Sequence, residues 1–302
     1  MSVKKNARDY IWQPYLVAFL DILNQGELLR KLEAFPRNQG SDQDFRRALQ
    51  KTVGTVVKFK KTFTQSFESA YRERPIPLDL PSDQKAIYDD LKERSDMLRP
   101  RIQSFSDSLV IYVPLIDLDK VIQLDGIYAT LLAIAYSFIY FMADENVFRG
   151  GIDIGYGVEI DDNEIYGPAI VKAYDLESKV AKYPRIVISD TLERYLFEIL
   201  NKPQADPVSQ NNRGLAKICR EMLMVDGDGR YAIDYLGYHI YSNKAKKFIA
   251  SNLIPKALSF LQKQLNVIKE KKDIDQYLYY NCLVPYFEDR LPLWGVKANL
   301  TT

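Results

Sequence analysis

The sequence predicts an α+β fold, in which a sheet is covered by helices. Apolar runs at residues 15–23 and 102–113 read as buried strands, and the second run is interrupted by a turn, as in a hairpin. Longer segments, such as 42–72 and 243–270, repeat apolar residues at helical spacing. An Asp-Gly-Asp-Gly turn at 226–229 between two apolar runs is a strong hairpin signal. Strands, helices and hairpins in this mixed order indicate an α+β sheet.

The remaining elements follow from local signals. Residues 74–82 contain three prolines and residues 204–214 are polar, so both stretches are predicted to be irregular. The glycine-rich strand at 147–159 indicates close approach of another backbone or of a ligand. The other predicted elements are helices at 27–35, 83–99, 119–144, 168–182 and 190–200, a strand at 185–189, hairpin strands at 221–225 and 231–236, and an aromatic tail from 273 that packs back on the domain.

Composition excludes several functional classes. The 302 residues are 47% apolar, which suffices for one large domain or two small ones. Lys and Arg number 41 against 40 Asp and Glu, so no overall field attracts nucleic acid. The two cysteines, Cys219 and Cys282, form no CxxC motif, which argues against a zinc site and fits a reducing cytoplasm. The single histidine, His239, cannot support a histidine metal cluster or a Ser-His-Asp triad.

No membrane partner is expected. The basic N-terminus has no apolar core of the signal-peptide type after it. The stretch 126–143 approaches the length of a membrane span, but it contains tyrosines and is flanked by Asp125, Asp144 and Glu145. We therefore expect it to be a buried helix.

Two aspartates interrupt the predicted strands and are the first candidates for chemistry. Asp21 lies in the apolar run 17–23, and Asp107 lies in a Ser-Asp-Ser turn. A carboxylate in a buried strand is costly unless it is paired, and divalent cations favour carboxylate oxygens. A single aspartate at a strand end is more often a cap or an ion-pair partner. The order of the two aspartates along the chain, and the position of one of them in a hairpin, are more informative than either residue alone. Side by side, the two could bind two metals and a triphosphate.

Together with two later segments, these aspartates resemble the catalytic core of class III nucleotidyl cyclases. That family has a Phe-x-Asp-Ile strand, a hairpin aspartate, an Arg-x-Gly-Ile strand and a Gly-x-x-Val-Asn-x-Ala-x-Arg helix. The matching segments are Phe19-Leu20-Asp21-Ile22, Ser106-Asp107, Arg149-Gly150-Gly151-Ile152 and the run from Gly167 to Asp175. The resemblance implies a ferredoxin-like core, an antiparallel sheet covered by helices, over about 15–240. It leaves an N-terminal extension at 1–14, a helical insertion at about 36–100 and a C-terminal helical extension at 241–302.

The departures from the family pattern concern the base pocket and the transition-state clamp. Val171 occupies the position of the helix Asn, and Asp175 that of the helix Arg. Lys172 is the nearest cation. Gln103 stands where adenylate-specific enzymes have a lysine, whereas the acid that contacts the base is retained as Glu164.

This pattern is similar to the bacterial anti-phage cyclases of Pycsar systems, which make cyclic pyrimidine nucleotides. The shared features are a Phe-Ser-Asp-Ser hairpin, an Arg-Gly-Gly-Ile strand, a Gly-Pro-Ala helix start and the run Lys172-Ala173-Tyr174-Asp175-Leu176-Glu177. The resemblance implies a cytoplasmic enzyme that converts UTP to cyclic UMP, with a separate cyclic-nucleotide-binding effector that reads the product. Conversion of CTP to cyclic CMP and a non-catalytic nucleotide-binding module remain open.

The resemblance also implies roles for individual residues. Asp21, Asp107 and the Ile22 carbonyl would hold two Mn²⁺ or Mg²⁺ ions. Arg149 and Lys172 would contact phosphates, with a structural ion pair and a solvated helix position as their respective alternatives.

The base-recognition residues complete these expectations. Gln103 and Glu164 would contact the base edge, and Phe19 and Tyr166 would stack on the base unless they pack in the core. Class III sites form between two chains, so we expect a homodimer in which the metals of one chain face the 164–174 region of the other.

Overall fold

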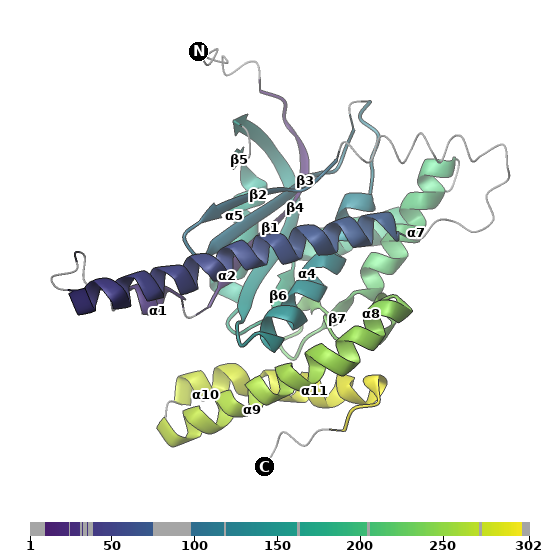
Figure 1. Cartoon of the computed structure of the whole chain (residues 1–302). Helices are drawn as coiled ribbons and strands as arrows, with labels where there is room; N and C mark the ends of the chain where they lie inside the picture. Colours follow the sequence, from purple (N-terminus) through teal and green to yellow (C-terminus); the bar gives the residue numbers. More distant parts are fainter. Residues whose placement is uncertain are drawn as a thin grey trace.

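The computed structural model describes residues 10–297, except for 24, 31, 33–34, 36–38, 75–97, 118, 162–163, 204–205 and 272–273 (Figure 1). The predicted helix at 83–99, apart from its last two residues, lies outside the described residues. So do the predicted irregular stretch at 75–82 and the first nine residues of the N-terminal extension.

Within this described part, eight strands form one sheet in the order β2-β3-β1-β4-β6-β8-β7, with β5 paired to β4. The strands are β1 (Gln13–Ile22), β2 (Arg101–Phe105), β3 (Ser108–Pro114), β4 (Phe148–Asp161), β5 (Glu164–Tyr166), β6 (Ile186–Ile188), β7 (Leu223–Val225) and β8 (Tyr231–Ile233). Only the β4–β6 pair is parallel among these strands. A mostly antiparallel sheet covered by helices confirms the predicted α+β class.

Helices occupy most of the remaining described chain. They are α1 (Gln25–Arg30), α2 (Gln39–Arg72), α4 (Asp125–Ala143), α5 (Pro168–Asp175) with its π-helical continuation η2 (Leu176–Val180), α6 (Asp190–Asn201), α7 (Pro207–Glu221), η3 (Tyr238–Ile240), α8 (Asn243–Phe248), η4 (Ile249–Leu253), α9 (Ile254–Lys271), α10 (Ile274–Asn281), α11 (Leu283–Arg290) and η5 (Leu291–Trp294). Figure 1 shows α2 crossing the sheet alongside α4, and α9, α10 and α11 packed together near the C-terminus.

The two faces of the sheet are covered differently, because side chains of a strand alternate between faces. On β1, Leu16, Ala18 and Leu20 belong to the large core that also contains α2 and α4. Tyr15 and Val17 belong to a smaller cluster beneath α5. We call the side with this smaller cluster the α5 face.

Glycine in β4 allows α5 to lie close to the strand, as the glycine-rich sequence predicts. A Cβ atom placed on Gly151 would lie 2.4 Å from the carbonyl oxygen of Ala173. Such a contact is far shorter than van der Waals packing allows, so only glycine fits here without displacing the helix.

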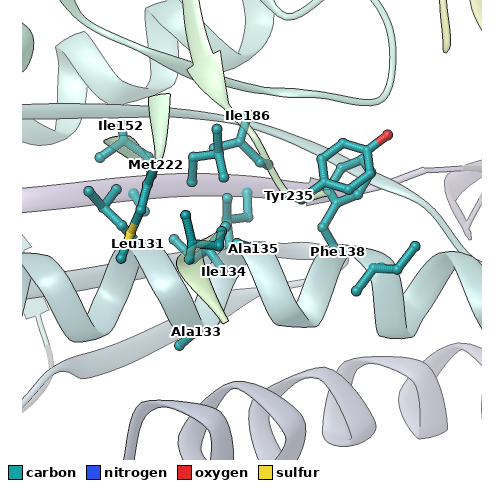
Figure 2. Close-up of a cluster of buried hydrophobic side chains, with 14 of the residues drawn as sticks. Leu131, Ala133, Ile134, Ala135, Phe138, Ile152, Ile186, Met222 and Tyr235 are labelled. Atoms are coloured by element: carbon teal, nitrogen blue, oxygen red, sulfur yellow. The ribbon is translucent and has the colours of Figure 1, made fainter. Parts of the chain in front are cut away.

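Helix α4 is the centre of the large core. Figure 2 shows Leu131, Ile134 and Phe138 of α4 facing Ile152 of β4 and Ile186 of β6. Among the described helices, α4 alone is long and apolar enough to cross a membrane, and 78% of its most apolar window is buried inside the protein. The expectation of a buried helix at 126–143 is confirmed.

The prediction of an irregular segment at 204–214 is wrong for residues 207–214, which form the first half of α7. The side chain of Asp206 caps this helix by accepting a hydrogen bond from the Ser209 backbone N–H at 3.0 Å. Pro207 occupies the first turn. An Asp-Pro pair is a helix-start signal, and the polar composition of the segment concealed it.

The C-terminal helices share the large core with the sheet, as expected for the aromatic tail. Residues of α9, α10 and α11 belong to the same buried cluster as β1 and α4. The indole N–H of Trp294 donates to the carbonyl of Leu236 at 2.8 Å, and Arg290 Nε donates to Asp234 Oδ2 at 2.9 Å. These bonds attach the end of the chain to the segment that follows β8.

Candidate active site

The strand register brings four of the predicted site residues onto the α5 face, in two neighbouring rows. Residues opposite one another in an antiparallel pair project to the same face. The row nearest the end of β1 contains Phe105, Ser108, Asp21 and Arg149 across β2, β3, β1 and β4. The next row contains Gln103, Val110, Phe19 and Gly151.

Asp107 reaches the first row from the turn of the β2–β3 hairpin. The preceding residue, Ser106, has a φ of 56°, a left-handed conformation that tightens this turn. The backbone N–H of Ile22 donates to the Asp107 carbonyl at 3.1 Å, which joins the turn to the end of β1. The Asp107 carboxylate lies over the start of α1, where a Cβ on Gly26 would be 3.6 Å from its Oδ2 atom.

Asp107 is close enough to Asp21 to affect the ionisation of Asp21. Burial raises the pKa of Asp21, and the negative charge of Asp107 raises it further. Arg149 and a hydrogen bond from Ser108 Oγ, 3.3 Å from Asp21 Oδ1, act in the opposite direction on this pKa. The net result is a carboxylate that is held in an unfavourable electrostatic environment.

Arg149 bridges Asp21 and a second, buried carboxylate. Its Nε atom donates to Glu177 Oε1 at 2.7 Å, while its Nη2 atom is 3.9 Å from Asp21 Oδ2. Glu177 lies in η2 and is 3% exposed. Burial raises the pKa of Glu177, the charge of Arg149 lowers it, and the charge of Asp21 raises it.

Glu177 was not assigned a role from the sequence. It is part of the run Lys172–Glu177 that carries the resemblance, and this was the only available signal. Its side chain reaches the row of Asp21 through a π-helical turn, which local sequence patterns do not indicate. Such turns are frequent at functional sites.

Phe19 and Gln103 belong to the next row. The Phe19 ring has a packing partner, whereas one polar atom of Gln103 has no hydrogen-bond partner among the described residues. Phe19 is half-buried, and its ring packs edge-on against Tyr174 of α5 at a centroid distance of 5.2 Å. The Oε1 atom of Gln103 is buried and has no hydrogen-bond partner among the described residues. A buried acceptor without a partner is rare and points to a ligand or a water at this position.

The other predicted residues lie away from Asp21 within one chain. Glu164 and Tyr166 are on β5, and Tyr166 pairs with Val158 at the far end of β4, nine positions beyond Arg149. Nine strand residues span roughly 30 Å. Lys172 is exposed on α5, beside Asp153. Burial raises the pKa of Asp153, and the charge of Lys172 acts in the opposite direction.

The residues at the positions of the family's helix Asn and Arg make no catalytic contact within the chain. The Val171 side chain is 58% exposed. Asp175 forms an ion pair with Lys179, one turn further along, at 2.8 Å. Neither residue supplies a cation to the row of Asp21.

The donor set at Asp21 and Asp107 fits a hard divalent cation. Across the described chain, no group of three or more His, Cys, Asp or Glu side chains is placed to hold a metal ion. Mg²⁺, however, is commonly held by one or two carboxylates together with substrate phosphates. A cation between Asp21 and Asp107 would also relieve the repulsion that raises the pKa of Asp21.

Comparison of the chain with protein-family models, with curated proteins and with solved structures finds no match. The arrangement of Asp21, Asp107, Arg149 and Glu177 is therefore the basis for the function considered next.

Proposed function

We propose that the chain is a metal-dependent pyrimidine nucleotide cyclase, which converts UTP to 3′,5′-cyclic UMP and pyrophosphate as a second messenger in anti-phage defence. The observation that carries the proposal is the position of Asp107 near Asp21, whose pKa is raised first by burial and then by the negative charge of Asp107. Carboxylates kept together at an energetic cost are typical of functional sites. Cyclisation of CTP by the same residues is the alternative substrate choice.

The order of elements supports the class III cyclase assignment. A ferredoxin-like cyclase core places the first strand between the hairpin that bears the second aspartate and the strand that bears the arginine. Here β1 lies between β3 and β4. The Phe-x-Asp-Ile, Ser-Asp and Arg-Gly-Gly-Ile segments thereby occupy adjacent strand ends.

In this reaction the ribose 3′-hydroxyl attacks the α-phosphate in line, and pyrophosphate leaves. Two Mn²⁺ or Mg²⁺ ions held by Asp21, Asp107 and the Ile22 carbonyl would lower the pKa of the hydroxyl and neutralise the triphosphate. Among the described residues, Arg149 is hydrogen-bonded only through Nε, to Glu177. Glu177 thereby orients Arg149 and leaves its Nη1 group available for phosphate oxygens, while Nη2 lies 3.9 Å from Asp21 Oδ2.

The pyrimidine would lie against the second row of the site. The ring of Phe19 offers a stacking surface, and the unpartnered Oε1 of Gln103 can accept from uracil N3–H or from cytosine N4–H. This acceptor does not distinguish UTP from CTP, so the choice of UTP is the part of the proposal that needs direct measurement.

A homodimer explains why Glu164 and Tyr166 lie far from Asp21 in the same chain. In the proposed dimer the 164–174 region of one chain meets the metal aspartates of the other. Exposed apolar side chains support an interface here, because patches of this kind mark association surfaces. They are Phe105, Tyr156, Tyr166, Val171 and Tyr174.

A cytoplasmic enzyme with no nucleic-acid or membrane partner is part of the same proposal. Its product would be read by a separate cyclic-nucleotide-binding effector.

One observation favours a second candidate, a nucleotide-binding module without turnover. The family's transition-state Arg is replaced by Asp175, which is paired with Lys179. No cation therefore occupies that position to stabilise the pentavalent phosphate.

Incubation with each of the four NTPs and Mn²⁺, followed by mass spectrometry of the products, tests both candidates. We expect cyclic UMP from the wild-type chain and a loss of several orders of magnitude in Asp107→Ala. Asp44→Ala, at an exposed position of α2, is the matched control and should keep full activity. Binding of UTP without any product supports the second candidate, and the absence of both binding and product refutes the two.

A further inference from the structure

A cavity lies on the opposite side of the sheet from the candidate active site. It has a volume of about 450 Å³, is partly open to solvent, and is lined by α2, α4 and the η3–α8 segment. Pockets that bind small molecules typically measure about 300–1,000 Å³. Helices α2 and α4 cover the face opposite to the α5 face, so none of the cavity residues belongs to the rows of Asp21 and Phe19.

One wall of the cavity is a stripe of large side chains on α4, three of which are tyrosines. Tyr128, Leu132, Tyr136 and Tyr140 are spaced four residues apart, so they lie along one side of the helix, and all four line the cavity. The rings of Tyr136 and Tyr140 are nearly parallel, with an interplanar angle of 26°. Tyr241 adds a fourth tyrosine from the segment before α8. Flat rings arranged in this way suit a planar ligand.

The rim of the cavity on α2 is a polar stripe. Its members recur every three or four residues and are Thr62, Gln65, Ser66, Ser69 and Glu73. Gln65, Ser69 and Glu73 are exposed, so this stripe borders the cavity on its solvent side. A polar rim beside a wall of tyrosines suits a ligand that is positioned through a few hydrogen bonds.

Several of these polar groups have no hydrogen-bond partner among the described residues. Thr52 and Thr55, earlier on α2, donate to backbone carbonyls four residues back at 3.0 Å, whereas Thr62 does not. As far as the structure describes the chain, the side chains of Thr62, Gln65, Ser66, Tyr128 and Tyr136 make no hydrogen bond. Burial raises the pKa of Tyr128 to about 12, so its hydroxyl stays protonated and able to donate.

The charges at the cavity balance. Among the described residues, Glu73 and Lys244 are the charged residues that line it, and they have opposite signs. A site for a phosphorylated nucleotide would need clustered Arg or Lys donors. The cavity therefore favours an uncharged ligand.

We propose that this cavity binds a neutral, planar heteroaromatic molecule of the nucleobase or nucleoside class. The tyrosine stripe of α4 stacks on the ring, and the hydroxyl and amide groups of α2 bond to its polar edge. This site is independent of the cyclase proposal, because it uses no residue of the candidate active site.

The test measures binding of adenosine and uridine to the full chain in EDTA, by saturation-transfer NMR and thermal shift. Glucose serves as a non-planar control, and UMP as a charged one. Ser66→Trp fills the cavity, and Thr64→Trp is the matched control, because Thr64 is exposed and outside the cavity on the same helix. Gln65→Leu, at an exposed position, removes an amide without adding bulk.

We expect at least one nucleoside to bind, with affinity at least tenfold weaker in Ser66→Trp, several-fold weaker in Gln65→Leu and unchanged in Thr64→Trp. The loss in Ser66→Trp separates this site from the candidate active site, because Ser66 lies on α2, outside the rows of Asp21 and Phe19. The proposal is overturned if neither nucleoside binds, if glucose or UMP binds as tightly, or if both Ser66→Trp and Gln65→Leu bind like the wild type.

Discussion

Replacement of Asp21 by asparagine should stabilise the protein when no divalent cation is present. Asparagine keeps the shape of the side chain and can still accept the hydrogen bond from Ser108, but it carries no charge. The negative charge at Asp21 is opposed by burial and by Asp107, so its removal relieves an unfavourable interaction.

The size of the effect follows from the opposing contributions. Arg149 lies 3.9 Å from Asp21, and such a pair attracts by at most about 4 kcal/mol at an effective dielectric constant of about 20. Both side chains are about a quarter exposed, so solvent screening reduces this attraction considerably. The pKa of Asp21 is nevertheless raised, so burial and repulsion exceed the attraction. We expect Asp21→Asn to increase the free energy of unfolding by about 1 kcal/mol at pH 7.

The advantage of the variant should depend on pH in a defined direction. Because the pKa of Asp21 is raised above 3.8, the folded wild type binds more protons than the unfolded chain between the unfolded and the folded pKa. The stability of the wild type attributable to this group therefore falls as the pH rises through that window. The difference between variant and wild type should be full at pH 7 and shrink toward zero as the pH approaches 3.8.

Urea denaturation followed by circular dichroism measures these differences, in EDTA and in excess Mn²⁺. At a Mn²⁺ concentration 100 times its Kd the wild type should gain about 2.7 kcal/mol, and Asp21→Asn much less, which reverses their order. The control Asp44→Asn, whose ion pair with Arg47 is fully at the surface, should change stability by less than about 0.5 kcal/mol. A variant less stable than the wild type in EDTA would refute the electrostatic reasoning, and equal stabilisation of both by Mn²⁺ would refute the metal assignment.

Two further substitutions test the packing around the site. Gly151→Ala should destabilise the fold by about 3 kcal/mol in urea denaturation, because its Cβ would lie 2.4 Å from the Ala173 carbonyl, whereas Gly227→Ala, with no atom within 4 Å, should be nearly neutral. Equal stability of the two variants would show that α5 can move away freely. Arg185→Met should cost about 3 kcal/mol and lower the melting temperature by several degrees, because buried Arg185 donates to Asp228 at 2.6 Å and to Asp226 at 2.8 Å. An unchanged melting temperature would mean that the β7–β8 hairpin does not need this arginine.

Local sequence patterns were sufficient for the strands and hairpins that position the site. The apolar run around Asp21 and the glycine-rich run after Val147 correspond to β1 and β4, and the turn at 226–229 joins β7 to β8. These signals are local, because burial and turn chemistry act on consecutive residues. The start of α7 also has a local signal, Asp206-Pro207, but the polar composition of residues 204–214 conceals it.

The arrangement of the site required three-dimensional information. The hydrogen bond between Glu177 and Arg149 depends on how α5 and η2 lie on β4. The close packing of the helix on the strand at Gly151 determines that arrangement. The separation of Glu164 from Asp21 follows from the length of β4, since the two residues lie toward opposite ends of it. Side-chain spacing along a sequence carries no information on such long-range geometry.

The bonds between the last helices and the segment after β8 have a practical consequence for producing the protein. Asp234 is buried, and its Oδ1 atom accepts hydrogen bonds from the Tyr286 hydroxyl at 2.8 Å and from Arg290 Nε at 3.0 Å. A fragment truncated after residue 240 would leave this carboxylate without its partners and would expose the flank of α4 that α9 covers. Recombinant expression should therefore retain the full C-terminus, because the shortened polypeptide would be prone to aggregate.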